Sequence, residues 1–286
     1  MKMDFFTIAY NAMPFIAWHV DVFRELEGVD WRWTIAEGAA MNVKDTHWCR
    51  KIEPGLSTDG TKEYLDWLAA TEPRVSVIHD KSWHGKTAQV NACLKGRGDY
   101  AVLVQIDADE IWSAAQLRTI GEVFEADQKL KVMKFACNYF FGPSIVAVEH
   151  EAPGRPWPDW IRAWRYKGGL RFITHEPPNL AGNFGPSLNP GETHKLGLMF
   201  NHYSYATEAQ VAFKERYYGQ DRAVECWKRL QDNHKWPLRN VNKFLYWCGP
   251  HTGADLFNGE SSNEEFDAIV ACGAKAKEEM ARAAHP

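Results

Sequence analysis

Short apolar runs alternate with helical patterns over the first half of the chain, and this alternation is what most constrains the fold. Runs with the length and composition of buried strands occur at residues 5–9, 31–36, 74–80 and 100–107. Segments with helical spacing or helix-capping residues follow them, at 15–26, 57–70, 86–95 and 114–127. Strands that alternate with helices indicate an α/β fold, in which a mostly parallel sheet carries helices on both faces. In such sheets, ligands bind beyond the carboxyl ends of the strands.

The fourth apolar run, VLVQID, ends in a cluster of acids. Asp107, Asp109 and Glu110 follow one another closely after residues that favour burial. Because a buried carboxylate without partners is costly, we expect these acids to emerge at the ligand-binding edge of the sheet. Asp-x-Asp at such a place suits Mg²⁺ or Mn²⁺, which take oxygen ligands and share them with substrate phosphates. The alternative is a turn with solvated acids, in which Glu110 opens the next helix.

The length and composition indicate an ordinary globular protein. The 286 residues are enough for one large domain or two small ones. No apolar run approaches the ~20 residues that a membrane-spanning helix needs, and the N-terminus lacks the layout of a signal peptide. The six cysteines are scattered without a C-x-x-C pair, as expected for small core residues in a reducing compartment. We therefore expect a soluble cytoplasmic protein.

After residue 130 the pattern changes. Residues 142–200 are rich in Gly, Pro, Trp and His, which predicts loops and short strands, whereas the chain from 207 onward has helical patterns. Segment 155–243 holds 14 Lys and Arg against 8 Asp and Glu, a net charge of +6, while the remainder has 19 against 29, a net charge of -10. This basic, aromatic-rich segment is either a set of solvated helix faces or a surface that meets an anionic partner or substrate.

Several segments carry a family resemblance. TIAYNAMPF, STDGTKEYL, VIHDKSWHGKTAQVNACLK and YAVLVQIDADEIW follow one another over residues 5–125. In order and spacing they resemble the opening strand, helix start, Gly-Lys helix and aspartate strand of the family 2 glycosyltransferases with a GT-A fold. Later, THEPPN and FNHYSYATEAQVAFKERYYG resemble elements of some members.

The resemblance implies a Rossmann-like GT-A architecture in three parts. Residues 1–135 would form the nucleotide-sugar-binding half, 136–206 the acceptor-side half and 207–286 a C-terminal helical extension. It also implies a nucleotide-sugar donor, most commonly a UDP-sugar, and a divalent cation, Mn²⁺ or Mg²⁺. The implied metal ligands are Asp107, Asp109 and His202, with Asp109 as the direct ligand and Asp107 reaching the ribose or the metal. A structural histidine is the alternative at position 202.

Other donor-side residues follow from the same resemblance. The opening loop supplies Ala9, Tyr10 and Asn11. Family members usually have an aspartate pair directly before S-T-D-G-T; here that pair is missing, and Glu37 at the end of the second strand is its expected substitute. Lys86 at a helix start either touches the donor diphosphate or is a surface lysine.

The acceptor side centres on Glu176 in a Pro-flanked loop. A carboxylate there can deprotonate an acceptor hydroxyl. The alternative is an acid paired to Arg162, Arg165 or Arg171. Flat aromatic faces stack on sugars or bases, and the segment is basic. The residues expected on the acceptor side are therefore Trp160, Arg165, Arg171 and His175.

These expectations combine into an inverting, metal-dependent glycosyltransferase that acts on a hydroxyl acceptor. The acceptor is a saccharide, a protein or a hydroxymethylated base of DNA, the last of which would have to be made accessible, for example by flipping. One alternative is a nucleotidyltransferase of similar fold, although IAYNAMPF lacks the Gly-rich, basic first loop of that class. The other is a non-catalytic module that binds a sugar or a nucleic acid.

Overall fold

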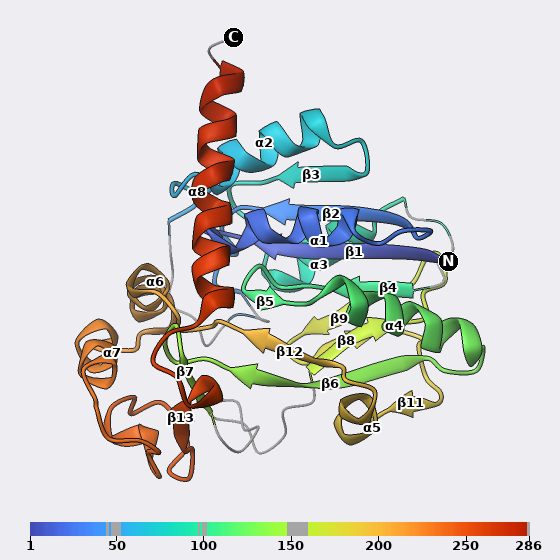
Figure 1. Ribbon diagram of the computed structural model, residues 1–286. Coiled ribbons are helices and arrows are strands. Elements are labelled where there is room, and N and C mark those ends of the chain that lie inside the picture. The colour runs from blue at the N-terminus through green and yellow to red at the C-terminus, as the bar shows by residue number, and fades with distance from the viewer. Residues whose placement is uncertain (44–45, 47–52, 97, 99–101, 148–159, 285–286) are drawn as a thin grey trace.

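A mixed sheet forms the centre of the molecule (Figure 1). The computed structural model describes residues 1–43, 46, 53–96, 98, 102–147 and 160–284. Within these, the strands follow the order β3-β2-β1-β4-β8-β6-β12-β5, with β11 paired to β6. Their bounds are β1 Lys2–Ala9, β2 Asp30–Glu37, β3 Val75–His79, β4 Val102–Gln105, β5 Glu110–Ile111, β6 Val132–Tyr139, β8 Trp160–Trp164, β11 Ser187–Leu188 and β12 Met199–His202. The strands from the first half, β3-β2-β1-β4, are all parallel.

The sheet departs from a parallel arrangement where the second half joins it. Strand β8 is antiparallel to both β4 and β6, and β5 is antiparallel to β12. Two short ribbons lie outside the sheet: β9 (Phe172–His175) with β10 (Pro178–Leu180), and β7 (Ile145–Ala147) with β13 (Ala254–Leu256). The expected α/β fold with a mostly parallel sheet is confirmed. The loop-rich region is also found, and its short strands complete the sheet.

Helices cover both faces of the sheet, as the sequence predicted (Figure 1). Adjacent residues of β1 point to opposite faces: Phe5 stacks on Phe23 of α1, whereas Phe6 packs in a second core beside α3. This alternation is the expected period of a strand buried on both sides. The helices are α1 Trp18–Arg24, α2 Thr61–Thr71, α3 Lys86–Leu94, α4 Ala114–Ala126, α5 Pro190–Lys195, α6 Glu208–Tyr218, α7 Ala223–Gln231 and α8 Glu264–Ala284, with 3₁₀ turns at Phe15–Ala17, Val241–Lys243 and Phe257–Gly259.

The C-terminal helix α8 returns to the first half of the chain (Figure 1). It packs against the Phe15–Ala17 turn and against α2. Gly273 lies so close to the opening loop that a Cβ there would come within 2.4 Å of the Cβ of Pro14. The absence of a side chain at this position therefore lets α8 form one wall next to the end of β1.

Two further predictions concern compartment and membrane. The cysteines of the described part are free thiols, while Cys49 lies outside it. Among the described helices, none combines the length and apolar character that crossing a bilayer requires.

Candidate active site

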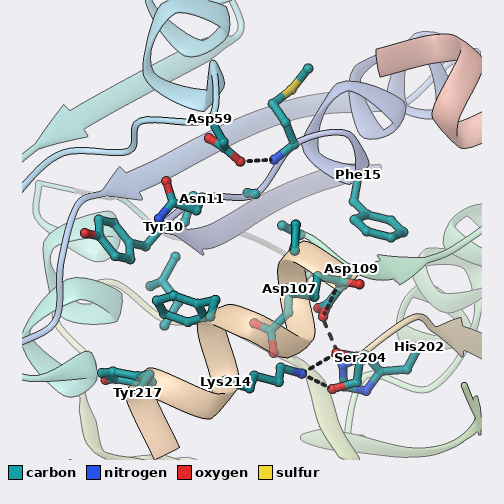
Figure 2. A pocket seen from close by; sticks show the side chains of 18 of the residues that line it. Tyr10, Asn11, Phe15, Asp59, Asp107, Asp109, His202, Ser204, Lys214 and Tyr217 are labelled. Atoms are coloured by element: carbon teal, nitrogen blue, oxygen red, sulfur yellow. Dashed lines mark hydrogen bonds and ion pairs between the residues drawn. The ribbon is translucent and has the colours of Figure 1, made fainter. Parts of the chain in front are cut away.

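A cavity of about 1220 Å³ opens beyond the carboxyl ends of β1 and β4 (Figure 2). The first half of the chain contributes the loop after β1, the loop after β4 and the start of α3; the second half contributes β12, the β9–β10 turn and α6. Most of the site residues predicted from the sequence line it, namely Ala9, Tyr10, Asn11, Lys86, Asp107, Asp109, Trp160, His175, Glu176 and His202.

The S-T-D-G-T segment starts helix α2, as predicted, and also holds the opening loop in place. Thr61, the last residue of the segment, is the first residue of α2, and Gly60 is its N-cap, whereas Ser57 and Asp59 contact the loop after β1. The backbone N–H groups of Asn11 and Met13 donate to the hydroxyl of Ser57 at 2.9 Å and the carboxylate of Asp59 at 3.0 Å. Asn11 adopts a left-handed backbone, φ 53°, which asparagine tolerates better than most residues. Tyr10 and Asn11 are thereby fixed at the cavity wall.

Glu110 and Arg162 form an ion pair, which we call the buried pair, next to the loop of residues 106–109 that carries Asp107 and Asp109, the aspartate loop. Arg162 donates from Nε and Nη2 to the Glu110 carboxylate at 2.6–2.9 Å, and the two side chains are 0% and 3% exposed. Burial raises the pKa of Glu110 to about 7, although the guanidinium opposes that shift. Arg162 Nη2 also donates to Asp107 Oδ2 at 3.1 Å. Glu110 is thus a partner of the aspartate loop and does not open α4, which is capped by Ser113.

Asp109 lies on the far side of the same loop, beside His202 (Figure 2). Its Oδ1 is 3.5 Å from Nε2 of His202, and its backbone carbonyl accepts from Tyr203 N–H at 2.8 Å. Burial would raise the pKa of Asp109, but His202 and Lys214 together hold it below its usual range. On the other side, buried His19 of α1 contacts the Ala108 carbonyl through Nε2 at 2.8 Å. The aspartate loop is therefore fixed from both halves of the chain.

The predicted metal ligands fit a divalent cation in part. Asp109 and His202 converge, and the buried Nδ1 of His202 has no hydrogen-bond partner in the described residues. Asp107 is already engaged, since Oδ1 accepts from Gln105 at 3.0 Å and Oδ2 from Arg162. Across the described chain, no three His, Cys, Asp or Glu side chains gather closely enough to hold a metal by themselves. The geometry suits a cation that takes one or two protein ligands and completes its shell with substrate phosphates.

Lys86 and Glu176 form a second ion pair, the cavity pair, at the opposite wall. Lys86 Nζ donates to Glu176 Oε1 at 2.6 Å, with side-chain exposures of 14% and 41%. His175 Nδ1 lies 3.5 Å from the same oxygen. Burial would raise the pKa of Glu176, but Lys86 and His175 hold it well below its usual range. The sequence left open a pairing of Glu176 with one of three arginines; its partner in the structure is this lysine.

Three of the predicted site residues do not line the cavity. Glu37 is fully buried and accepts from Ser57 N–H at 2.6 Å while contacting His79 at 2.8 Å, so it supports the S-T-D-G-T segment from behind. Arg165 donates to backbone carbonyls at and after the end of α4, including Asp127 at 3.0 Å and Leu130 at 3.0 Å. Arg171 is exposed at the start of the β9 ribbon. Glu37 is at the cavity end of β2 but is covered by Ser57 and His79. Arg165 follows β8 at the end opposite Trp160, because β8 runs antiparallel to β4, and Arg171 precedes β9, whose other end carries His175.

Helix α6 supplies cavity residues that the sequence reasoning missed. Gln210, Phe213, Lys214 and Tyr217 line the cavity with helical spacing, and this aromatic and basic stripe is the signal that could have identified them. The ring centroids of Phe213 and Tyr10 lie 5.7 Å apart, so aromatic faces from both halves meet. Lys214 donates to Ser204 O at 2.5 Å, and burial lowers the pKa of this lysine to about 8. Helix α8 adds Val270 and Lys277.

Comparison with known proteins agrees with the resemblance seen in the sequence. Residues 55–172 match the family described as glycosyl transferase family 2. No curated protein matches the chain.

Solved structures give more distant likenesses. The structure of S. aureus TarS 1-349 is 14% identical with a TM-score of 0.40, and covers 58% of this chain and 47% of its own. The same fragment in complex with UDP is 13% identical with a TM-score of 0.39, at the same coverage. S. aureus TarS over a longer chain is 12% identical with a TM-score of 0.38, and 28% of its length is covered. This chain thus matches less than half the length of each, and similarities of this size carry no functional argument.

Proposed function

Because the chain carries a glycosyl transferase family 2 region over residues 55–172, we propose that it transfers a sugar from a nucleotide-sugar donor to a hydroxyl acceptor. One observation carries the proposal: Asp107 and Asp109, from the loop after β4, and Glu176, from the β9–β10 turn, face a single cavity beyond the carboxyl ends of the parallel strands β1 and β4. Such a cavity can hold a diphosphate near the aspartates and a hydroxyl near a carboxylate base.

The donor would lie along the first half of the chain. Tyr10 and Phe213 offer aromatic faces to a base, and Asn11 is fixed beside them. Lys86 and the N-terminal end of α3 favour the negative charge of a diphosphate. A UDP-sugar is the donor we propose. We retain the three-part division, with residues 1–135 as the donor half, 136–206 as the acceptor half and 207–286 as a helical extension, and we add that α6 of this extension lines the donor cavity.

The proposed reaction inverts the anomeric carbon. Glu176 accepts the proton of the acceptor hydroxyl, whose oxygen attacks the anomeric carbon while the diphosphate leaves from the opposite face. Asp109 and His202, with Asp107 beside them, would hold Mn²⁺ or Mg²⁺, which neutralises charge on the leaving diphosphate. Lys214 adds a further positive charge beside Asp109.

The test of donor and enzyme class is hydrolysis of nucleotide sugars. Purified protein with Mn²⁺ should slowly release UDP from a UDP-sugar, and chelation should stop this. Asp109→Ala should abolish release without unfolding the protein, because the Asp109 side chain is 23% exposed at the cavity. Release of pyrophosphate instead of a nucleoside diphosphate would indicate a nucleotidyltransferase, and binding without turnover a non-catalytic module.

The acceptor class can be separated by salt. With donor saturating, the log of the affinity for a DNA acceptor should fall with log salt by ~0.9 per phosphate contacted, because bound counterions are released. A neutral saccharide should give an almost flat response. Of the cations predicted on the acceptor side, Arg165 is engaged with α4 and Arg171 lies outside the cavity, which favours a saccharide or protein acceptor over DNA.

A further inference from the structure

In the cavity pair, Lys86 can contact either of two anionic groups: the Glu176 carboxylate or the diphosphate of a bound donor. Lys86 is the first residue of α3, and it reaches across the cavity to Glu176 on the β9–β10 turn. Both side chains line the space in which the donor diphosphate would lie. A diphosphate carries more negative charge than one carboxylate and would meet the positive end of α3 at the same point. Lys86 therefore faces the proposed base and the proposed leaving group at once.

Two of the other cations that line the cavity, Arg162 and Lys214, are held by partners away from Glu176, and the lining also includes Arg216 and Lys277. Arg162 donates to the buried carboxylate of Glu110. Lys214 donates to Ser204 and lies near Asp109. In the described part of the chain, the contacts of Glu176 with charged groups are those of Oε1 with Lys86 and His175. Removing Lys86 from this carboxylate would thus leave it with His175, and would restore its ability to accept a proton.

Resting on the function proposed above, we propose that Lys86 is a positioning residue that moves from Glu176 to the donor diphosphate, so that donor binding releases the base. Before the donor binds, the ammonium group holds the carboxylate at 2.6 Å and makes it a poor proton acceptor. After the donor binds, the ammonium remains protonated but contacts phosphate oxygens. The exchange changes hydrogen bonds only, and no covalent bond forms or breaks. Because the base is released only after the donor has bound, the exchange requires the donor to bind before the acceptor reacts.

This exchange predicts an unusual effect on donor binding. Because Glu176 competes with the diphosphate for Lys86, Glu176→Gln should tighten the binding of a nucleoside diphosphate about three- to tenfold, although it destroys turnover. Lys86→Met should weaken binding about tenfold. In the Lys86→Met background, Glu176→Gln should have almost no effect, since there is no ammonium left to release.

Calorimetric titration of UDP, GDP, CDP and ADP in the presence of Mn²⁺, with the four proteins of this cycle, tests the exchange. Equal tightening by Glu176→Gln in both backgrounds would reveal a general loss of negative charge and overturn it. If Lys86→Met fails to fold, Lys86→Gln, which also removes the charge, replaces it in the cycle. Lys86→Arg keeps the charge and should preserve the tightening by Glu176→Gln. If the unaltered protein binds none of the four nucleotides, the proposed function fails together with this inference; binding without coupling removes the exchange alone.

Discussion

The buried pair and the cavity pair join the same types of group but differ in their surroundings. Glu110 of β5 and Arg162 of β8 are both buried, and they share several hydrogen bonds at 2.6–2.9 Å. Lys86 and Glu176 share one contact at 2.6 Å, and Glu176 is 41% exposed. Breaking a buried pair leaves a charge that water cannot reach, whereas an exposed partner is resolvated at once. We therefore expect the buried pair to stabilise the fold, and we propose that the cavity pair takes part in the chemistry.

The largest expected effect separates the two pairs by activity. Glu176→Gln keeps the size and hydrogen bonding of the side chain but removes its ability to accept a proton. We expect a rate loss of about 10²–10⁴ with an unchanged free energy of unfolding. The measurement is sugar transfer under saturating donor, with urea unfolding in parallel.

Glu208→Gln is the matched control, because Glu208 pairs with Lys228 at 2.7 Å with both side chains more than half exposed and lies outside the cavity lining. It should leave the rate unchanged. A loss below threefold in Glu176→Gln would move the role of base to another carboxylate.

The second effect separates the pairs by stability. Arg162→Met strands the buried Glu110 carboxylate and should lower the free energy of unfolding by about 3–5 kcal/mol. Lys86→Met should lower it by less than about 1 kcal/mol. Urea denaturation of both variants gives the comparison directly.

Pairing Arg162→Met with Glu110→Gln should recover much of the loss, because the stranded charge is gone. Equal destabilisation by Arg162→Met and Lys86→Met would contradict the distinction between the two pairs.

The elements and the acids of the first half could be predicted because they depend on local patterns. Alternating strands and helices predict the parallel sheet, and the polar end of VLVQID predicts the position of Asp107 and Asp109 at its edge. The partners of those acids could not be predicted in this way. Arg162 meets Glu110 because β8 inserts antiparallel beside β4, a long-range pairing that leaves no local signal.

The same limit applies to Glu37 and to helix α6. Glu37 has the expected position in sequence, yet it is covered by Ser57 and His79, contacts that depend on how the following loop folds back. In α6, Lys214 and Phe213 face the cavity because the second half of the chain wraps around the first. The helical stripe could be read from the sequence, but the surface against which it packs could not.

A third, smaller effect concerns His19, a buried group that forms no ion pair within the described part of the chain. His19 is 2% exposed, and burial lowers its pKa from 6.5 to about 4. The neutral ring donates Nε2–H to the Ala108 carbonyl between the two aspartates. Since the unfolded chain binds this proton more readily, stability is full above pH 6.5 and declines as the pH falls toward 4, by about 3 kcal/mol at most.

His19→Gln can keep the hydrogen bond without titrating, so its unfolding free energy should change less over this pH range. Urea denaturation at intervals from pH 7 to pH 4 measures the difference. Identical pH profiles for the two proteins would show that His19 does not control acid stability.

The smallest expected effect is the response of each pair to salt, and it tests the comparison most directly. Raising the ionic strength from 0.1 M to 1 M shortens the Debye length from about 10 Å to about 3 Å, which screens charges that solvent reaches. Double-mutant cycles report the coupling within each pair: Lys86→Met with Glu176→Gln, and Arg162→Met with Glu110→Gln. Unfolding is followed in urea, because guanidinium chloride is itself a salt.

The coupling of the cavity pair should be below about 1 kcal/mol at low salt and should fall by more than half at high salt. The coupling of the buried pair should stay constant, since ions cannot enter between side chains that are 0% and 3% exposed. If both couplings fell together, water would have access to the buried pair, and Glu110 would have to be reconsidered as a group that takes part in the chemistry of the cavity.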